Sequence, residues 1–131
     1  MDVYEFAETL NLGEDISSLP EFERTIFVIV ALETEVNNGG FDQFYFNSSG
    51  RIANEVPNAL VRIGAPIMAN IVQRSNAILG LAVPLDDVAR QTKLEKLEED
   101  SEGIFEVFDD EFLAYPEDLN QLLQRYYAQR N

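Results

Sequence analysis

The fold of this chain is decided by the stretch Ile26-Phe27-Val28-Ile29-Val30-Ala31-Leu32, in which all seven residues are apolar. Such a run has no polar face to turn toward water, so it belongs in the interior. A buried strand has the same pattern, but long glutamate-rich flanks extend the segment over residues 19–37. These flanks favour a central buried helix, with Pro20 in its first turn and Gly39 or Gly40 as its left-handed C-terminal cap.

The rest of the chain also repeats its apolar residues at helical spacing. Residues 47–50 form a turn cluster, after which two short helical pieces are expected, with Pro57 near the start of the second. Further helices are predicted to begin at Pro66, at the N-cap Asp86 and at Pro116. We therefore expect an all-α fold: a single compact domain over residues 1–131, with six to seven helices around the buried central helix.

Charge is the dominant feature of the composition. Among 131 residues, 24 acids and 9 bases give a net charge of −15, and cysteine and histidine are absent. The acids gather at the two ends, because residues 1–36 and 95–131 each have a net charge of −8 whereas residues 37–94 have +1. A protein of this charge is repelled by nucleic-acid phosphates and by anionic membranes, so basic proteins are its natural partners.

The sequence contains no targeting signal that we recognise. The N-terminus has neither a basic region nor a long apolar region of the secretory type. Its longest apolar run is seven residues, whereas a membrane span needs about 20. These features predict a soluble, cytoplasmic protein.

A second acidic feature is the tract 95–118, which holds eleven acids and one base. If residues 94–112 were helical, four of its acids would stand at successive i,i+4 positions, and each like-charge pair would cost about 0.2–0.5 kcal/mol. The tract is either a solvated face or an anionic surface that copies a DNA backbone and binds a basic partner. The candidate partner-binding acids are Glu98, Glu99, Asp100, Glu102, Glu106, Asp109, Asp110 and Glu111. N-terminal acids would widen this surface if they lay on the same side: Glu5, Glu8, Glu14, Asp15, Glu21 and Glu23.

The most distinctive motif is Asn38-Gly39-Gly40-Phe41-Asp42-Gln43-Phe44-Tyr45-Phe46-Asn47. It predicts a helix stop followed by a short aromatic helix that plugs the core, with the side chains of Gln43 and Asn47 tying the turn to the backbone. The alternative is a polar pocket built from Asn38, Gln43 and Asn47. The residues that we expect to be structural are Asn38, Gly39, Gly40, Phe41, Gln43, Phe44 and Asn47.

This motif resembles the signature of a family of small bacterial helical domains that includes an acidic DNA-mimic protein. The resemblance continues through residues 55–60, 63–65 and 108–112 and through the last helix, so it covers most of residues 20–127. It implies an all-helical fold. By analogy with the DNA mimic, it also implies binding to the DNA-contacting surface of a helix-turn-helix repressor.

The sequence offers only weak candidates for a catalytic or metal-binding motif. Asp86-Asp87 and Asp109-Asp110-Glu111 supply carboxylates, but the chain lacks an Asp-x-Asp-x-Asp-Gly loop, and Ser48-Ser49-Gly50 has no evident partner base. We therefore predict no catalytic residue, no metal and no cofactor.

The function predicted from these patterns is that of a non-catalytic acidic binding protein, a DNA mimic. Its expected partner is a basic DNA-binding protein such as a helix-turn-helix transcription regulator, with no direct binding to nucleic acid or to a membrane. One alternative is an immunity-type inhibitor of a basic nuclease or toxin. Another, from a different class, is a carboxylate metal-binding or enzymatic pocket protein.

Overall fold

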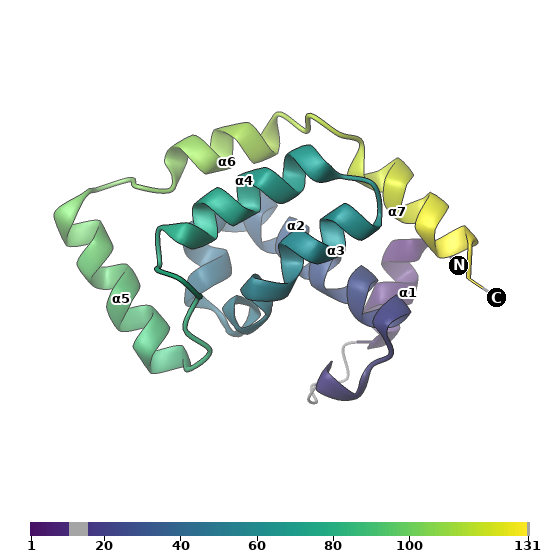
Figure 1. Ribbon diagram of the computed structural model, residues 1–131, viewed down its shortest axis with the longest axis horizontal. Coiled ribbons are helices and arrows are strands. Elements are labelled where there is room, and N and C mark those ends of the chain that lie inside the picture. Colours follow the sequence, from purple (N-terminus) through teal and green to yellow (C-terminus); the bar gives the residue numbers. More distant parts are fainter. Residues whose placement is uncertain (11–15, 131) are drawn as a thin grey trace.

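A computed structural model describes residues 1–10 and 16–130, and in these residues every regular element is a helix (Figure 1). The prediction of an all-α fold is confirmed, with seven α-helices and two 3-10 helices in this part of the chain. In chain order they are α1 (Val3–Leu10), η1 (Ile16–Ser18), α2 (Glu21–Phe46), η2 (Ser48–Glu55), α3 (Val56–Arg62), α4 (Pro66–Ala77), α5 (Asp87–Asp100), α6 (Glu106–Leu113) and α7 (Leu119–Ala128).

Helix α2 is the centre of the molecule, as its apolar stretch predicts. Ile26, Ile29 and Leu32 are completely buried, and α2 contacts α1, η2, α3, α5 and α6. One face of the helix is less covered than the sequence suggests, because Phe27 and Val30 are only partly buried. A helix that packs against five neighbours organises the whole core, so its burial determines where the surface helices lie.

The glycine pair bends α2 where a helix stop was predicted. Gly39 and Gly40 leave helical geometry, and Gly40 has φ = 75°, a left-handed conformation that glycine adopts without steric cost. The following turns carry Phe41, Phe44 and Tyr45, all fully buried. Their rings pack against aromatic residues of the C-terminal half, with Phe41 and Phe112 at 5.9 Å between centroids. The predicted aromatic plug is therefore confirmed.

Most predicted helix starts agree with the structure, but the last is wrong. Helix α4 begins at Pro66, and the Asp86 side chain caps α5 by accepting a 2.8 Å hydrogen bond from the Ala89 N–H. The last helix begins at Leu119 rather than at Pro116, since Asp118 is its N-cap and accepts a 3.0 Å hydrogen bond from the N–H of Gln121. A capping carboxylate stabilises the start of a helix by accepting a hydrogen bond from a free N–H group, whereas proline is only compatible with the first turn.

The acidic tract is not one helix. Helix α5 ends at Asp100, Gly103 has φ = 71°, and α6 begins at Glu106. The expected ladder of acids at i,i+4 spacing is therefore wrong, and its only pair within one helix is Glu106 with Asp110. The left-handed glycine redirects the chain, so α5 and α6 run in different directions (Figure 1).

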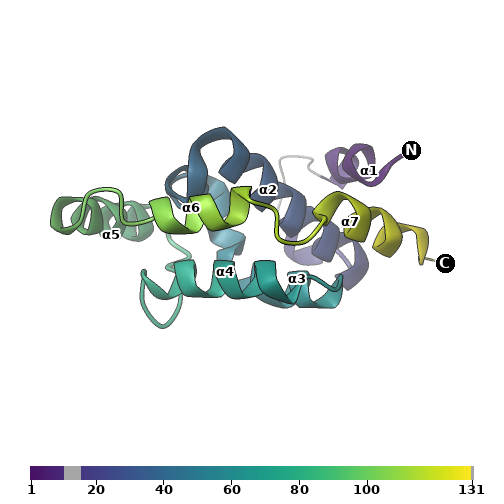
Figure 2. The same cartoon turned by 90° about the horizontal axis from the view of Figure 1, so that it is seen from above.

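The acids of α1 and those of α5 lie at opposite ends of the molecule, although α7 brings the end of the chain back beside α1. Helix α5 forms one end, and α1, α7 and the chain termini form the other, as both views show (Figures 1 and 2). Helices α2, α3 and α4 lie between them. Within the described ranges, none of the helices combines the length and the apolar character that crossing a membrane requires.

Candidate partner-binding surface

Many carboxylates of this protein are engaged in holding the fold together. Asp2, Asp86 and Asp118 cap α1, α5 and α7, and Glu117 accepts hydrogen bonds of 3.1 and 2.8 Å from the N–H groups of Ile67 and Met68 at the start of α4. Negative charge at a helix N-terminus also complements the helix dipole. The ion pairs among described residues are Arg24–Glu55, Arg51–Asp87, Arg62–Glu21, Arg74–Glu111 and Arg90–Asp87.

The carboxylates that remain are concentrated at the α5 end. We define the α5–α6 acidic surface as the acids from the end of α2 to α6 that have neither a hydrogen bond nor an ion pair within the described residues. Its members are Asp42, Glu95, Glu99, Asp100, Glu102, Glu106 and Asp110. Elsewhere in residues 1–10 and 16–130 only Glu5, Glu8 and Glu23 meet the same criterion. The fold therefore uses acids throughout the chain but leaves most of its unengaged ones in one region.

Helices α2, α5 and α6 bring negatively charged side chains close to one another at the α5–α6 acidic surface. The pKa of Asp42, on α2, is raised by partial burial and then by the charges of Glu98, Asp109 and Glu106 from α5 and α6. Like charges raise the pKa of a carboxyl because they disfavour its ionised form. Asp42 was not among the predicted acids, since it lies far from residues 95–118 in the sequence and only the packing of α2 against α5 and α6 brings them together.

The eight predicted partner-binding acids divide into two groups. Three are engaged in the fold: Glu98 accepts a 2.9 Å hydrogen bond from the N–H of Gly103, Asp109 accepts one of 2.8 Å from the N–H of Phe41, and Glu111 forms an ion pair of 2.6 Å with Arg74. The others are Glu99, Asp100, Glu102, Glu106 and Asp110, and all of these are exposed.

The N-terminal acids do not extend the α5–α6 acidic surface. Glu5 and Glu8 belong to α1, and Glu21 and Glu23 belong to the start of α2, at the opposite end of the molecule from α5 (Figures 1 and 2). Glu14 and Asp15 lie outside the described residues. Because the two ends are separated by the core helices, a partner that covers α5 and α6 does not reach α1 through the same contact.

Gln43 and Asn47 were predicted to bond to the backbone of the turn, but in the described residues their side-chain amides meet instead at one carboxylate, that of Glu35. Gln43 donates a hydrogen bond of 2.5 Å from Nε2 to Oε2 of Glu35, and Asn47 donates to the same oxygen at 3.3 Å. Glu35 precedes the bend of α2 and both amides follow it, so the bonds span the Gly39–Gly40 step. Asn38 is exposed and shares a shallow pocket with Gln43 and Glu35, whereas Asn47 does not line that pocket.

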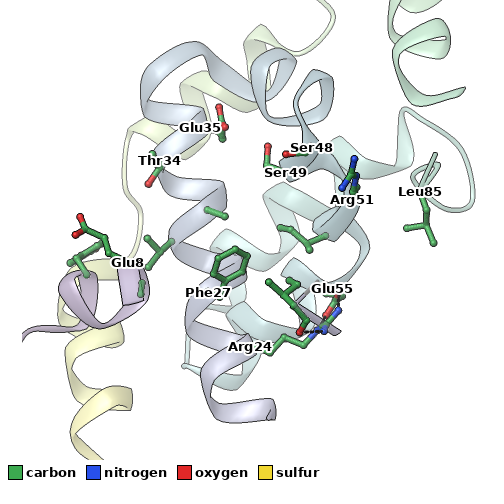
Figure 3. A pocket seen from close by; sticks show the side chains of 16 residues that line it. Glu8, Arg24, Phe27, Thr34, Glu35, Ser48, Ser49, Arg51, Glu55 and Leu85 are labelled. Atoms are coloured by element: carbon green, nitrogen blue, oxygen red, sulfur yellow. Dashed lines mark hydrogen bonds and ion pairs between the residues drawn. The ribbon is translucent and has the colours of Figure 1, made fainter. Parts of the chain in front are cut away.

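Away from this surface, a groove of about 770 Å³ lies between α1, α2 and η2 (Figure 3). Phe27, Val30 and Ile52 contribute apolar walls, and the ion pair Arg24–Glu55 lies at its edge. None of the eight predicted acids lines this groove. In the described part of the chain, no group of three or more acidic side chains is arranged to hold a metal ion.

Comparison with known protein families gives a match that covers most of the chain. The family model described as DMP19-like protein matches residues 17–131, which include the signature, the bend of α2 and the whole of α5 and α6. The chain belongs to the DMP19-like family. The match begins after α1, so the family relationship covers the core and the α5–α6 acidic surface of this DMP19-like protein. No curated protein and no solved structure matched the chain.

Proposed function

We propose that this DMP19-like protein is a non-catalytic, cytoplasmic DNA mimic that occupies the basic DNA-binding surface of a partner, such as a helix-turn-helix transcription regulator. The observation that supports the proposal is the α5–α6 acidic surface, where α2, α5 and α6 gather carboxylates that the fold does not use. Unengaged carboxylates are free to pair with the arginine and lysine side chains that ordinarily contact phosphates.

The spacing of charge on helices suits this role. One strand of DNA carries a charge about every 3.4 Å along its axis. Side chains one helical turn apart, such as Glu106 and Asp110, have Cβ atoms about 5–6 Å apart. Carboxylates from neighbouring elements add charge at close range, because Glu98 and Glu106 contribute to the raised pKa of Asp42. The combined surface is denser in charge than one helix alone.

A solubilising role alone would not need charges crowded against one another. Asp42 is exposed but lies close to the charges of three other acids, and each close like-charge pair opposes folding. Solubility is served equally well by acids spread over the surface. The concentration of charge therefore supports an interaction with a cationic partner, which would relieve the repulsion upon binding.

A gel-shift competition tests the proposal. Helix-turn-helix regulators encoded beside this gene are bound to labelled operator DNA, and the purified protein is added at increasing concentration. We expect it to displace the DNA, and we expect added salt to weaken the protein complex steeply. The variant Glu99→Gln, Glu102→Gln, Glu106→Gln should raise the Kd of the complex on the order of tenfold to a hundredfold.

A matched control separates local charge from total charge. The variant Glu5→Gln, Glu8→Gln, Glu23→Gln removes the same three charges from unengaged acids at the other end of the molecule. It should leave the Kd nearly unchanged. Equal effects of the two variants would contradict the assignment to the α5–α6 acidic surface. Binding of a basic nuclease through the same acids, with no effect on any regulator, would assign immunity-type inhibition in place of mimicry.

A further inference from the structure

The exposed face of α6 is not uniformly charged. Val107 is 55% exposed and Leu113 is 45% exposed, although Phe108 and Phe112 on the same helix are buried in the core. The exposed face also carries Glu106 and Asp110 of the α5–α6 acidic surface. An apolar side chain left in water beside charged ones gains free energy only if a partner covers it.

Helical periodicity places these four residues on one exposed side of α6. Positions three, four or seven apart in a helix lie on one face. Asp110 is therefore a neighbour of Glu106, three residues after Val107 and three before Leu113. The result is a strip along α6 in which carboxylates and apolar side chains alternate, in the order Glu106, Val107, Asp110 and Leu113.

We infer that Val107 and Leu113 are specificity-determining contacts within the partner interface, and this inference rests on the function proposed above. The occupant is the same basic DNA-binding protein, because the carboxylates that alternate with the two apolar residues select a cationic surface. DNA presents only charged phosphates and sugars along its backbone, whereas this strip adds apolar contacts to the stems of arginine and lysine side chains. The strip therefore strengthens binding by a contribution that salt does not screen.

The test measures the Kd for the regulator that the gel-shift competition identifies, over a series of salt concentrations. The double variant Val107→Ser, Leu113→Ser should raise the Kd roughly tenfold at every salt concentration, because partly exposed apolar area is no longer buried on binding. The slope of log Kd against log salt should stay unchanged. Glu99→Gln, Glu102→Gln, Glu106→Gln should instead reduce that slope.

A matched control replaces two apolar side chains that are exposed to a similar degree on other helices. Val61 is 58% exposed on α3 and Ile67 is 53% exposed on α4, so Val61→Ser, Ile67→Ser removes comparable apolar surface from another part of the molecule. All four side chains are outside the core, and circular dichroism verifies that each variant is folded. The control should leave the Kd unchanged.

The possible outcomes separate the two proposals. If the acid variant loses affinity but Val107→Ser, Leu113→Ser binds like the control, the inference about α6 is overturned and the proposed function stands. If Val107→Ser, Leu113→Ser changes the salt slope rather than the Kd at all salts, the apolar contribution is also refuted. If no regulator is displaced from DNA, the proposed function fails and the inference fails with it.

Discussion

The carboxylate of Asp109 on α6 accepts a 2.8 Å hydrogen bond from the backbone N–H of Phe41, directly after the bend of α2. The bend interrupts the helical hydrogen bonds, so the first N–H groups of the following turns need acceptors from elsewhere. Asp109 supplies one from a distant part of the chain. It therefore links the glycine signature to the acidic tract, and it acts there as a remote helix cap rather than as a free charge.

This contact predicts a specific cost for Gly40→Ala. Gly40 has φ = 75°, and a Cβ atom would lie 2.7 Å from Oδ2 of Asp109. We expect a loss of about 1–3 kcal/mol in the free energy of unfolding, measured by urea denaturation. Gly64→Ala is the control, because Gly64 also has a positive φ but its Cβ would meet only a side-chain atom of Leu122 at 3.7 Å. Equal losses in the two variants would show that the Asp109 contact adds nothing to backbone strain.

Asp42→Asn should stabilise the protein at neutral pH. The pKa of Asp42 is raised in the folded state by burial and by Glu98, Asp109 and Glu106, so its ionised form opposes folding at pH values above that pKa. We expect a gain of a few tenths of a kcal/mol, because the side chain is largely exposed to solvent. The gain should shrink as the pH falls through the folded-state pKa, where the wild-type carboxyl becomes neutral. Unfolding curves at several pH values measure it, and a stability loss at neutral pH would contradict the prediction.

Arg90→Lys should be strongly destabilising. The Arg90 side chain is completely buried and donates hydrogen bonds to the carbonyls of Tyr45, Asn47, Pro84 and Leu85, and to the carboxylate of Asp87. An ammonium group cannot reach acceptors in so many directions, so several carbonyls lose their donor and a charge stays buried. We expect a loss of about 3–5 kcal/mol in thermal or urea unfolding.

The control for Arg90→Lys is a substitution at the exposed partner of the same carboxylate. Arg51→Lys alters the other ion pair of Asp87, and the Arg51 side chain is 60% exposed. It should cost less than about 1 kcal/mol. A similar small cost for Arg90→Lys would refute the view that the buried guanidinium attaches α5 to the end of α2.

Tyr115→Phe should change the response to alkaline pH. The Tyr115 hydroxyl donates a 2.8 Å hydrogen bond to Glu33, and burial together with that carboxylate raises the pKa of Tyr115 to about 12. The unfolded state ionises near the ordinary tyrosine value, so stability should fall as the pH rises from about 10 toward 12. Tyr115→Phe should lose about 1 kcal/mol at neutral pH and show a shallower alkaline decline. An unaltered decline, measured by unfolding at a series of pH values, would contradict a role for Tyr115.

The acidic tract shows where prediction from sequence stops. Its local composition is sufficient to locate a region rich in carboxylates, and six of the eight predicted acids are exposed. Local composition does not reveal that Glu111 is neutralised by Arg74 or that Asp109 bonds to Phe41, because those partners are distant in the sequence. It also does not reveal Asp42, whose acidic neighbours come from other helices.

The sequence alone determined the all-helical fold, the burial of α2 and a break in helical geometry at its glycine pair, because apolar periodicity and glycine conformation act over a few neighbouring residues. It also determined the total charge. Only the tertiary structure decided which carboxylates the fold engages, where α5 turns into α6, and that the α5–α6 acidic surface lies away from the acids of α1. These outcomes depend on packing between residues far apart in the chain, and electrostatic interactions depend on distance in space rather than on separation in sequence.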